Sequence, residues 1–213
     1  MKILLYLLSF LFLISIRAQN GFQEEVDNIV KRNDSLWDNS KETIVFTGSS
    51  SIRFWEDVQE RFPEQHILNS GFGGSQASDL LYHLEKLVLR YSPKKVFIYE
   101  GDNDVFAKKR PKEVVQTTLS IIQLIKNKNP NTSIILISAK PSIARWRLRR
   151  KYRRLNRRLE KLALSDMNLS YANVWDIMLD GRKVRTDIFI EDGLHMNAAG
   201  YELWYKKIKE HVD

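Results

Sequence analysis

The stretch Ile44-Val45-Phe46-Thr47-Gly48-Ser49-Ser50-Ser51 joins a short apolar run to a polar turn. A run of this length is typical of a strand buried in a sheet, and the glycine and serines after it are typical of the start of a helix. The same unit occurs twice more. His66-Ile67-Leu68-Asn69 precedes the loop Gly71-Phe72-Gly73-Gly74, and the run from Lys95 to Tyr99 precedes Gly101-Asp102-Asn103-Asp104. This order indicates a sheet whose strands end in polar loops.

Helical patterns alternate with the apolar runs, and together they predict the fold class. Further strands are expected at Ser133 to Ser138 and Tyr171 to Trp175, and helices at Gln23 to Trp37, Ser51 to Arg61, Ala77 to Arg90, Pro111 to Asn129 and Ala198 to Lys209. Five such strands favour an α/β fold with three α/β/α layers and a parallel, doubly wound, five-stranded sheet. Sites in such sheets lie beyond the carboxyl ends of the strands, so the polar loops should converge.

The first eighteen residues differ from the rest in composition. Lys2 is followed by an apolar stretch that runs to Ile14 and is interrupted by Ser9, and Ala18 is a small residue where a signal peptidase could cleave. The stretch is short for a transmembrane helix. We therefore expect a signal peptide over 1–18 and a single domain over 19–213, with an uncleaved anchor as the alternative. This predicts a secreted or periplasmic protein. The chain has no cysteine, so its stability must depend on its core.

The net charge of +8 is concentrated in one segment. Residues 145–161 hold ten basic residues and one acid, and the rest of the chain after residue 18 is slightly negative. Apolar residues recur there at steps of three and four, which predicts a helix with one face on the sheet. A solvated basic face is the simplest interpretation. Attraction to anionic lipid or polysaccharide is an alternative, Arg145-Trp146 could border the substrate cleft, and nucleic acid is not expected as a partner.

Ser50, His195 and Asp192 are the candidates for a catalytic triad. Ser50 lies where a helix is expected to begin, so its hydroxyl and its N–H can face one site, although a serine there could also be an ordinary helix cap. His195 belongs to the polar turn Asp192-Gly193-Leu194-His195. In such a turn the aspartate can reach the imidazole and fix its tautomer. An isolated Asp-x-x-His is a weak signal, because it also occurs in ordinary turns.

Gly74 and Asn103 could complete the site as oxyanion donors. A glycine lets its backbone N–H come close to a reacting group, and an asparagine amide supplies an uncharged donor. Each also has a structural interpretation, namely loop flexibility at 71–74 and an Asx-turn at 102–104. The occurrence of four such motifs in this order favours hydrolysis of an ester.

From about Thr43 to its C-terminus, the chain resembles the SGNH or GDSL-type hydrolases, which are esterases and lipases with a flavodoxin-like sheet. The family's roles fall on the residues already named: nucleophile Ser50, triad partners Asp192 and His195, and oxyanion donors Ser50, Gly74 and Asn103. The family's usual Gly-Asp-Ser reads Gly48-Ser49-Ser50 here, and the pattern Gly-Ser-Ser-Ser-Ile-Arg-x-Trp of one branch matches 48–55. The replaced aspartate is not a triad member. Ser51 is the alternative nucleophile.

The resemblance implies an exported carboxylic ester hydrolase that transfers an acyl group in two steps, with no metal and no organic cofactor. Small acyl esters, such as acetyl groups on carbohydrate, are the expected substrates. A lysophospholipase-like activity is one alternative, and a binding module that keeps the fold without turnover is another. His66, His83 and His195 lack the spacing of a zinc site.

Overall fold

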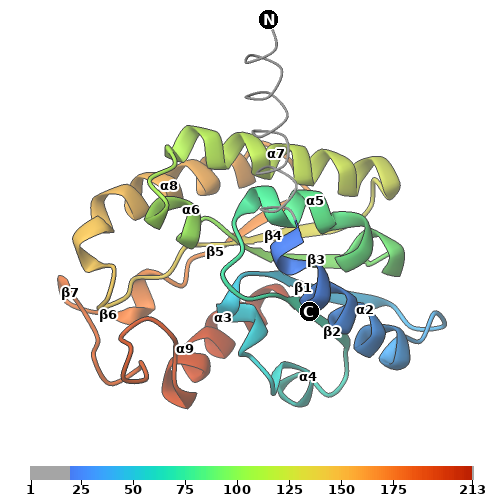
Figure 1. The fold of residues 1–213 in the computed structure, drawn as a ribbon, viewed down its shortest axis with the longest axis horizontal. Helices are drawn as coiled ribbons and strands as arrows, with labels where there is room; N and C mark the ends of the chain where they lie inside the picture. The colour runs from blue at the N-terminus through green and yellow to red at the C-terminus, as the bar shows by residue number, and fades with distance from the viewer. Residues whose placement is uncertain (1–19, 213) are drawn as a thin grey trace, which may run out of the picture.

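A computed structural model describes residues 20–212, and the predicted signal peptide lies outside the described residues. Five parallel strands form one sheet in the order β2-β1-β3-β4-β5, with helices on both of its faces (Figure 1). The strands are β1 (Thr43–Gly48), β2 (His66–Gly71), β3 (Lys95–Tyr99), β4 (Ser133–Ile137) and β5 (Leu169–Ala172). The predicted α/β class, with three layers and a parallel five-stranded sheet, is confirmed.

The strand order reverses at β1, and this positions the site. β2 pairs with one edge of β1, and β3, the next strand along the chain, pairs with the other edge of β1. Gly48 at the end of β1 pairs with Gly71 of β2 and with Tyr99 of β3. Open α/β sheets bind ligands in the crevice at such a reversal. The loops after β1, β2 and β3 therefore meet at one edge, as expected from the sequence.

The helices cover the two faces in separate layers. One layer contains α2 (Gln23–Leu36), α5 (Ala77–Leu87), α7 (Pro111–Lys128) and α8 (Arg149–Ala163), and the other contains α3 (Ser50–Arg53), α4 (Val58–Arg61) and α9 (Ala198–Ile208). The remaining elements are short: η1 (Asn20–Phe22), η2 (Leu89–Tyr91), α6 (Asp102–Phe106), η3 (Trp146–Leu148), η4 (Asp176–Met178), η5 (Lys209–His211), and a hairpin of β6 (Leu179–Asp180) and β7 (Lys183–Val184). Within 20–212, no helix is long and apolar enough to cross a membrane.

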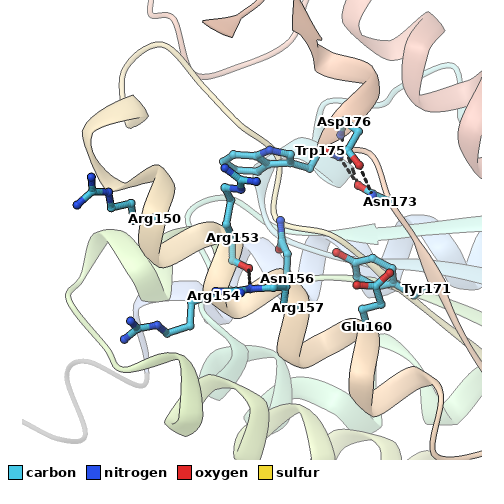
Figure 2. Close-up of a pocket in the computed structure, with 10 residues that line it drawn as sticks. All are labelled: Arg150, Arg153, Arg154, Asn156, Arg157, Glu160, Tyr171, Asn173, Trp175 and Asp176. Atoms are coloured by element: carbon cyan, nitrogen blue, oxygen red, sulfur yellow. Dashed lines mark hydrogen bonds between the residues drawn. The ribbon is translucent and has the colours of Figure 1, made fainter. Parts of the chain in front are cut away.

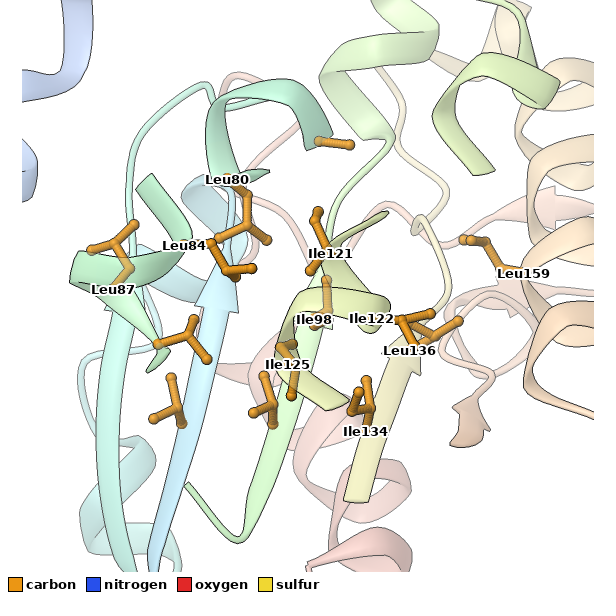
Figure 3. Close-up of a cluster of buried hydrophobic side chains, with 14 of the residues drawn as sticks. Leu80, Leu84, Leu87, Ile98, Ile121, Ile122, Ile125, Ile134, Leu136 and Leu159 are labelled. Carbon is orange, nitrogen blue, oxygen red and sulfur yellow. The ribbon is translucent and has the colours of Figure 1, made fainter. Parts of the chain in front are cut away.

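Alternating strand residues build a hydrophobic core on each face of the sheet. Ile98, Ile134 and Leu136 point toward α5 and α7, where Figure 3 shows them packed beneath Leu84 and Ile121. Their neighbours in the strands face α9 and its layer: Phe46, Phe97, Ile135 and Ile137. Burying one such side chain stabilises the fold by roughly 2 kcal/mol. Strands buried on both faces read as continuous apolar runs, which is why the sequence revealed them.

Three predicted elements differ clearly from those observed, and the ends of several others differ by one or two residues. The helix expected over Ser51 to Arg61 is two short helices, α3 and α4, because the chain between them turns Trp55 fully into the core. The helix expected to reach Arg90 ends at Leu87 and continues as a 3-10 turn. The last strand ends at Ala172 rather than Trp175, because the N–H groups of residues 174 and 175 donate to the Ser138 hydroxyl instead of to a neighbouring strand.

Candidate active site

The turn between β1 and α3 places Ser50. Gly48 has a φ of +129°, and a Cβ on it would lie 2.0 Å from the Tyr99 carbonyl oxygen, so a glycine is required where β1 and β3 end side by side. The N–H of Ser49 donates to that same oxygen at 3.1 Å. Ser50 is the first residue of α3, and a helix leaves the N–H groups of its first turn without intrahelical acceptors. Ser50 therefore presents a hydroxyl and a donor at the crevice.

Hydrogen bonds close the turn that carries Asp192 and His195 and connect it to the loop after β4 at the sheet edge. The N–H of Ile190 donates to the His195 carbonyl oxygen at 2.9 Å. Gly193 has a φ of +61°, in the left-handed region that favours glycine. Its carbonyl oxygen accepts a hydrogen bond of 3.0 Å from the N–H of Ala144, in the loop that follows β4. These contacts hold the turn at the edge where Ser50 lies.

Ser50, His195 and Asp192 form a continuous chain of hydrogen bonds. His195 Nε2 lies 3.0 Å from Ser50 Oγ, and His195 Nδ1 lies 2.5 Å from Asp192 Oδ2. The Phe54 ring packs edge-on against the imidazole, with ring centroids 5.0 Å apart. Ser51, the alternative nucleophile, is 3% exposed, and its carbonyl oxygen accepts a hydrogen bond from Tyr201. Of the two serines, the structure therefore brings Ser50 to the imidazole.

The Asp192 carboxylate is held in its ionised form by its neighbours. Its Oδ1 accepts from the N–H groups of Leu194 at 2.8 Å and His195 at 2.9 Å, and its Oδ2 faces the imidazole. Partial burial raises the pKa of Asp192, but these hydrogen bonds outweigh that effect and lower the pKa to about 2. The turn thus supplies a fixed negative charge that orients His195.

Within 20–212, two of the three groups predicted as oxyanion donors have no hydrogen-bond acceptor, and the third, the Asn103 amide, already has two. Among the described residues, the N–H groups of Ser50 and Gly74 donate to no acceptor, and Gly74 has a φ of +73°. Asn103 Nδ2 donates to Ser49 Oγ at 2.6 Å and to the Ser75 carbonyl oxygen at 2.8 Å. The amide therefore bridges the loops after β1 and β2. Donation to an oxyanion would require Asn103 to share or exchange its bond to Ser49.

A buried cluster of charges beneath the site was not foreseen from the sequence. The Asp102 carboxylate accepts from Arg145 at 2.5 Å, from Tyr152 at 2.6 Å and from Tyr99 at 3.0 Å, and Lys140 Nζ lies 3.6 Å away. The Lys140 side chain has no exposed surface. Burial raises the pKa of Asp102, but Lys140 and Arg145 outweigh it and keep the pKa below its ordinary value.

This cluster connects the two halves of the site. Arg145 Nη1 donates to Asn103 Oδ1 at 3.0 Å, so the guanidinium fixes which way the amide points. Lys140 Nζ donates to the Leu194 carbonyl oxygen at 2.7 Å, one residue before His195. Arg145 therefore borders the site, as the sequence suggested. A lysine directly after the most apolar strand was a signal that could have revealed the cluster, because a cation at a strand end needs a buried partner.

Glu100 is a second buried carboxyl group near the site. Its Oε1 accepts a hydrogen bond of 2.7 Å from Ser75, and its Oε2 is buried without a partner among the described residues. Burial, together with repulsion from Asp104, raises the pKa of Glu100 well above its usual value. The protonated form is therefore favoured beside the loop that carries Gly74.

The two other histidines whose spacing does not fit a zinc site have different partners. His66 Nε2 accepts from the N–H of Asp38 at 3.1 Å, and His83 packs edge-on against the rings of Phe72 and Tyr82. Within 20–212, no group of three or more histidine, aspartate or glutamate side chains is arranged to hold a metal ion.

Comparison with known proteins places this chain in a family. The model of the GDSL-like Lipase/Acylhydrolase family matches residues 34–203. The chain belongs to this family and is a carboxylic ester hydrolase. No curated protein sequence gives a match.

Solved structures share the fold at low sequence identity. A protein of Streptococcus pneumonia, provisionally described as a platelet activating factor, is 24% identical, with a TM-score of 0.78 over 94% of this chain and 99% of that one. A GDSL-like lipase from Bacteroides thetaiotaomicron is 23% identical, with a TM-score of 0.72 over 85% and 95%. A mutant of Axe2, an acetyl-xylooligosaccharide esterase from Geobacillus Stearmophilus, is 19% identical, with a TM-score of 0.66 over 79% and 93%.

Proposed function

We propose that the protein is an exported serine esterase that removes small acyl groups, such as acetyl, from carbohydrate. The observation that carries the proposal is the chain of hydrogen bonds from Ser50 Oγ through His195 to Asp192. A similar fold in an acetyl-xylooligosaccharide esterase supports the choice of an acylated sugar as the substrate class.

The reaction would proceed in two steps. His195 Nε2 takes the proton of Ser50 as its Oγ attacks the ester carbonyl carbon, and the Asp192 carboxylate stabilises the imidazolium that forms. The N–H groups of Ser50 and Gly74, with the Asn103 amide, would hold the oxyanion of the tetrahedral intermediate. The imidazolium then protonates the leaving alcohol, which completes the acyl-enzyme. Water, activated by the same imidazole, attacks the acyl-enzyme and releases the acid.

Hydrolysis of p-nitrophenyl acetate tests this assignment. Ser50→Ala should lower kcat by about 10⁴-fold or more, because the nucleophile is lost while the fold remains. Ser51→Ala is the matched control, since it removes a neighbouring hydroxyl that does not contact His195, and kcat should stay within about threefold. If the wild type does not hydrolyse the ester, the protein is a binding module without turnover and the esterase proposal fails. Full activity of Ser50→Ala would contradict the assignment.

A lysophospholipase-like activity is the second candidate, because apolar side chains surround the triad. Phe54 lies against His195 and is 42% exposed, and Ile143, beside Gly193, is also 42% exposed. Phe106 is 59% exposed and lies over the Arg145 guanidinium at 4.4 Å. Such a rim could bind the face of a sugar ring or a longer acyl chain. A comparison of acetyl and decanoyl esters separates the two: a higher kcat/KM for decanoyl would replace the carbohydrate proposal.

Export is the remaining part of the proposal, and it rests on the sequence alone. Cleavage after Ala18 would leave Gln19 at the mature N-terminus. Mass spectrometry of the protein recovered outside the cytoplasm tests this. A mass that matches residues 19–213 supports export with cleavage, and an intact chain held in the membrane fraction would indicate an anchor.

A further inference from the structure

A cavity of about 530 Å³ lies between helix α8 and residues 171–176, at the end of β5 (Figure 2), and the residues that line it do not include Ser50, Asp192 or His195. One wall is formed by four arginines of α8: Arg150, Arg153, Arg154 and Arg157. The opposite wall contains Tyr171 and Trp175. In Figure 2 the side chain of Arg153 extends toward the Trp175 ring, whereas Arg150 and Arg154 extend toward the outer side of the helix. The cavity therefore combines cations with aromatic surface.

The positive charge of this cavity is not compensated within the described part of the chain. None of its four arginines forms an ion pair there, although six arginines elsewhere do: Arg53, Arg61, Arg90, Arg110, Arg145 and Arg185. Two carboxylates also line the cavity, Glu160 and Asp176, and Asp176 accepts a hydrogen bond of 2.8 Å from Asn173. Arg153 extends toward Trp175, and Arg157 Nε donates to the Arg153 carbonyl oxygen at 3.4 Å, while Arg150 and Arg154 add positive charge on the outer side of the helix. Guanidinium groups without an acidic partner suit a carboxylate or another oxyanion.

The base of the cavity is fixed, so it can act as a platform. Trp175 is 6% exposed and stacks on Trp146, with ring centroids 6.2 Å apart and an angle of 18° between the planes. Asn156 donates to the Ala139 carbonyl oxygen and accepts from the Ala139 N–H, both at 2.9 Å. Its amide is therefore satisfied and ties α8 to the end of β4. Tyr152 also stacks on the Trp175 ring, with centroids 6.3 Å apart, so Trp175 supports the wall of the cavity. The partly exposed Tyr171 is the aromatic side chain that offers surface to the apolar face of a sugar ring.

The cavity and the catalytic residues lie at the same edge of the sheet. Tyr152, one position before Arg153, donates to the Asp102 carboxylate at 2.6 Å, next to Asn103. Trp146, in the stack behind the cavity, follows Arg145, whose guanidinium also reaches Asn103. The wall of the cavity is therefore connected to the loop of Asn103 through Tyr152 and Arg145.

We propose that this cavity binds the carboxylate groups of an acidic oligosaccharide, such as a chain of uronic acids, and so selects the sugar that carries the ester. The claim that the cavity selects the esterified sugar rests on the proposed function, whereas the claim that it binds an acidic oligosaccharide does not. An oligosaccharide is favoured over a lipid surface because the arginines line a hollow with aromatic side chains, and a flat bilayer would not enter it.

Calorimetric titration of the full mature chain with unesterified hexagalacturonate tests the binding. The neutral probe is xylohexaose, and vesicles of phosphatidylglycerol serve as the lipid probe. The cavity variant is Arg153→Gln/Arg154→Gln/Arg157→Gln. The matched control is Lys151→Gln/Arg158→Gln/Lys161→Gln, which removes the same charge from exposed positions of α8 that do not line the cavity.

We expect hexagalacturonate to bind at least about tenfold more tightly than xylohexaose, and the cavity variant to lose at least about tenfold in affinity. The control variant should lose less than about threefold. Equal losses in both variants would mean a general electrostatic attraction and would overturn the proposal, as would binding to vesicles without binding to hexagalacturonate. Both variants should hydrolyse p-nitrophenyl acetate like the wild type. A chain that binds hexagalacturonate but hydrolyses nothing would contradict the esterase assignment alone.

Discussion

Arg145 Nη1 donates a hydrogen bond of 3.0 Å to Asn103 Oδ1, and the same nitrogen lies 2.5 Å from the Asp102 carboxylate. The guanidinium thus holds the carbonyl side of the amide and leaves its NH₂ group directed at Ser49 and Ser75. A cation on the amide oxygen also strengthens the N–H groups as donors, because hydrogen bonds in a chain polarise one another.

Arg145→Lys should therefore lower kcat more than it changes KM. A lysine keeps the charge beside Asp102, but its ammonium lies one bond closer to the backbone and lacks the rigid guanidinium plane, so it should not reach both Asp102 and Asn103. We expect kcat for p-nitrophenyl acetate to fall by about tenfold, with KM within about twofold. The nearby, exposed Arg147→Lys is the control and should behave like the wild type. A rise in KM with unchanged kcat would assign Arg145 to substrate binding instead.

Ser49 stands where the family's usual motif has an aspartate, and its role is testable. Its side chain is 2% exposed and its Oγ accepts from Asn103 at 2.6 Å. Ser49→Ala removes that acceptor, so the amide loses one of its two anchors and kcat should fall by about tenfold. Ser49→Asp supplies an acceptor at the same place and should retain more activity than the alanine variant. Equal activity of the alanine variant and the wild type would show that Ser49 does not position Asn103.

The pH dependence should reflect one group on its acid side. The pKa of Asp192 is lowered to about 2, so this carboxylate stays ionised as the pH falls, until it nears that value. Asp192 then contributes nothing to the loss of kcat/KM between about pH 7 and 4, and a plot of log(kcat/KM) against pH should have a limiting slope no greater than about 1 in that range. A limiting slope of about 2 would mean that a second group titrates in the same range.

Asp192→Asn should lower kcat at every pH, by up to about 10⁴-fold, because the tautomer of His195 is no longer fixed.

Glu100 should make the fold less stable as the pH rises. Its folded pKa lies well above the ordinary value of 4.5, because the group is buried. At about pH 4 both states bind the proton, and above that the unfolded chain releases it more readily, so the free energy of unfolding falls with rising pH. Glu100→Gln removes the group that must stay protonated in the folded chain. The free energy of unfolding in urea should therefore be higher for this variant than for the wild type at about pH 8, and the same for both at about pH 4. The exposed Glu85→Gln should change stability by less than about 0.5 kcal/mol at either pH. A Glu100→Gln chain less stable than the wild type at high pH would contradict the account.

The strands and the pairing of Asp192 with His195 could be predicted because both depend on short stretches of sequence. Continuous apolar runs revealed the sheet, and the turn from Asp192 to His195 places acid and imidazole three residues apart. Strand ends were less predictable: β2 runs on through Asn69 and Ser70, because these polar residues pair with Phe46 and Thr47. The charged cluster joins Asp102, Lys140 and Arg145 from distant parts of the chain, so Lys140 could signal a buried partner but the sequence could not say which residue that partner is.

The central claim, that Ser50 is the nucleophile activated by His195, is tested most directly by covalent labelling. A fluorophosphonate should modify the native protein, and fragmentation of the peptide that contains residues 49–51 by mass spectrometry should place the added mass on Ser50. His195→Ala should slow the labelling by about 10³-fold or more, since the hydroxyl then lacks its base. A label on Ser49 or Ser51, or labelling that does not depend on His195, would contradict the claim.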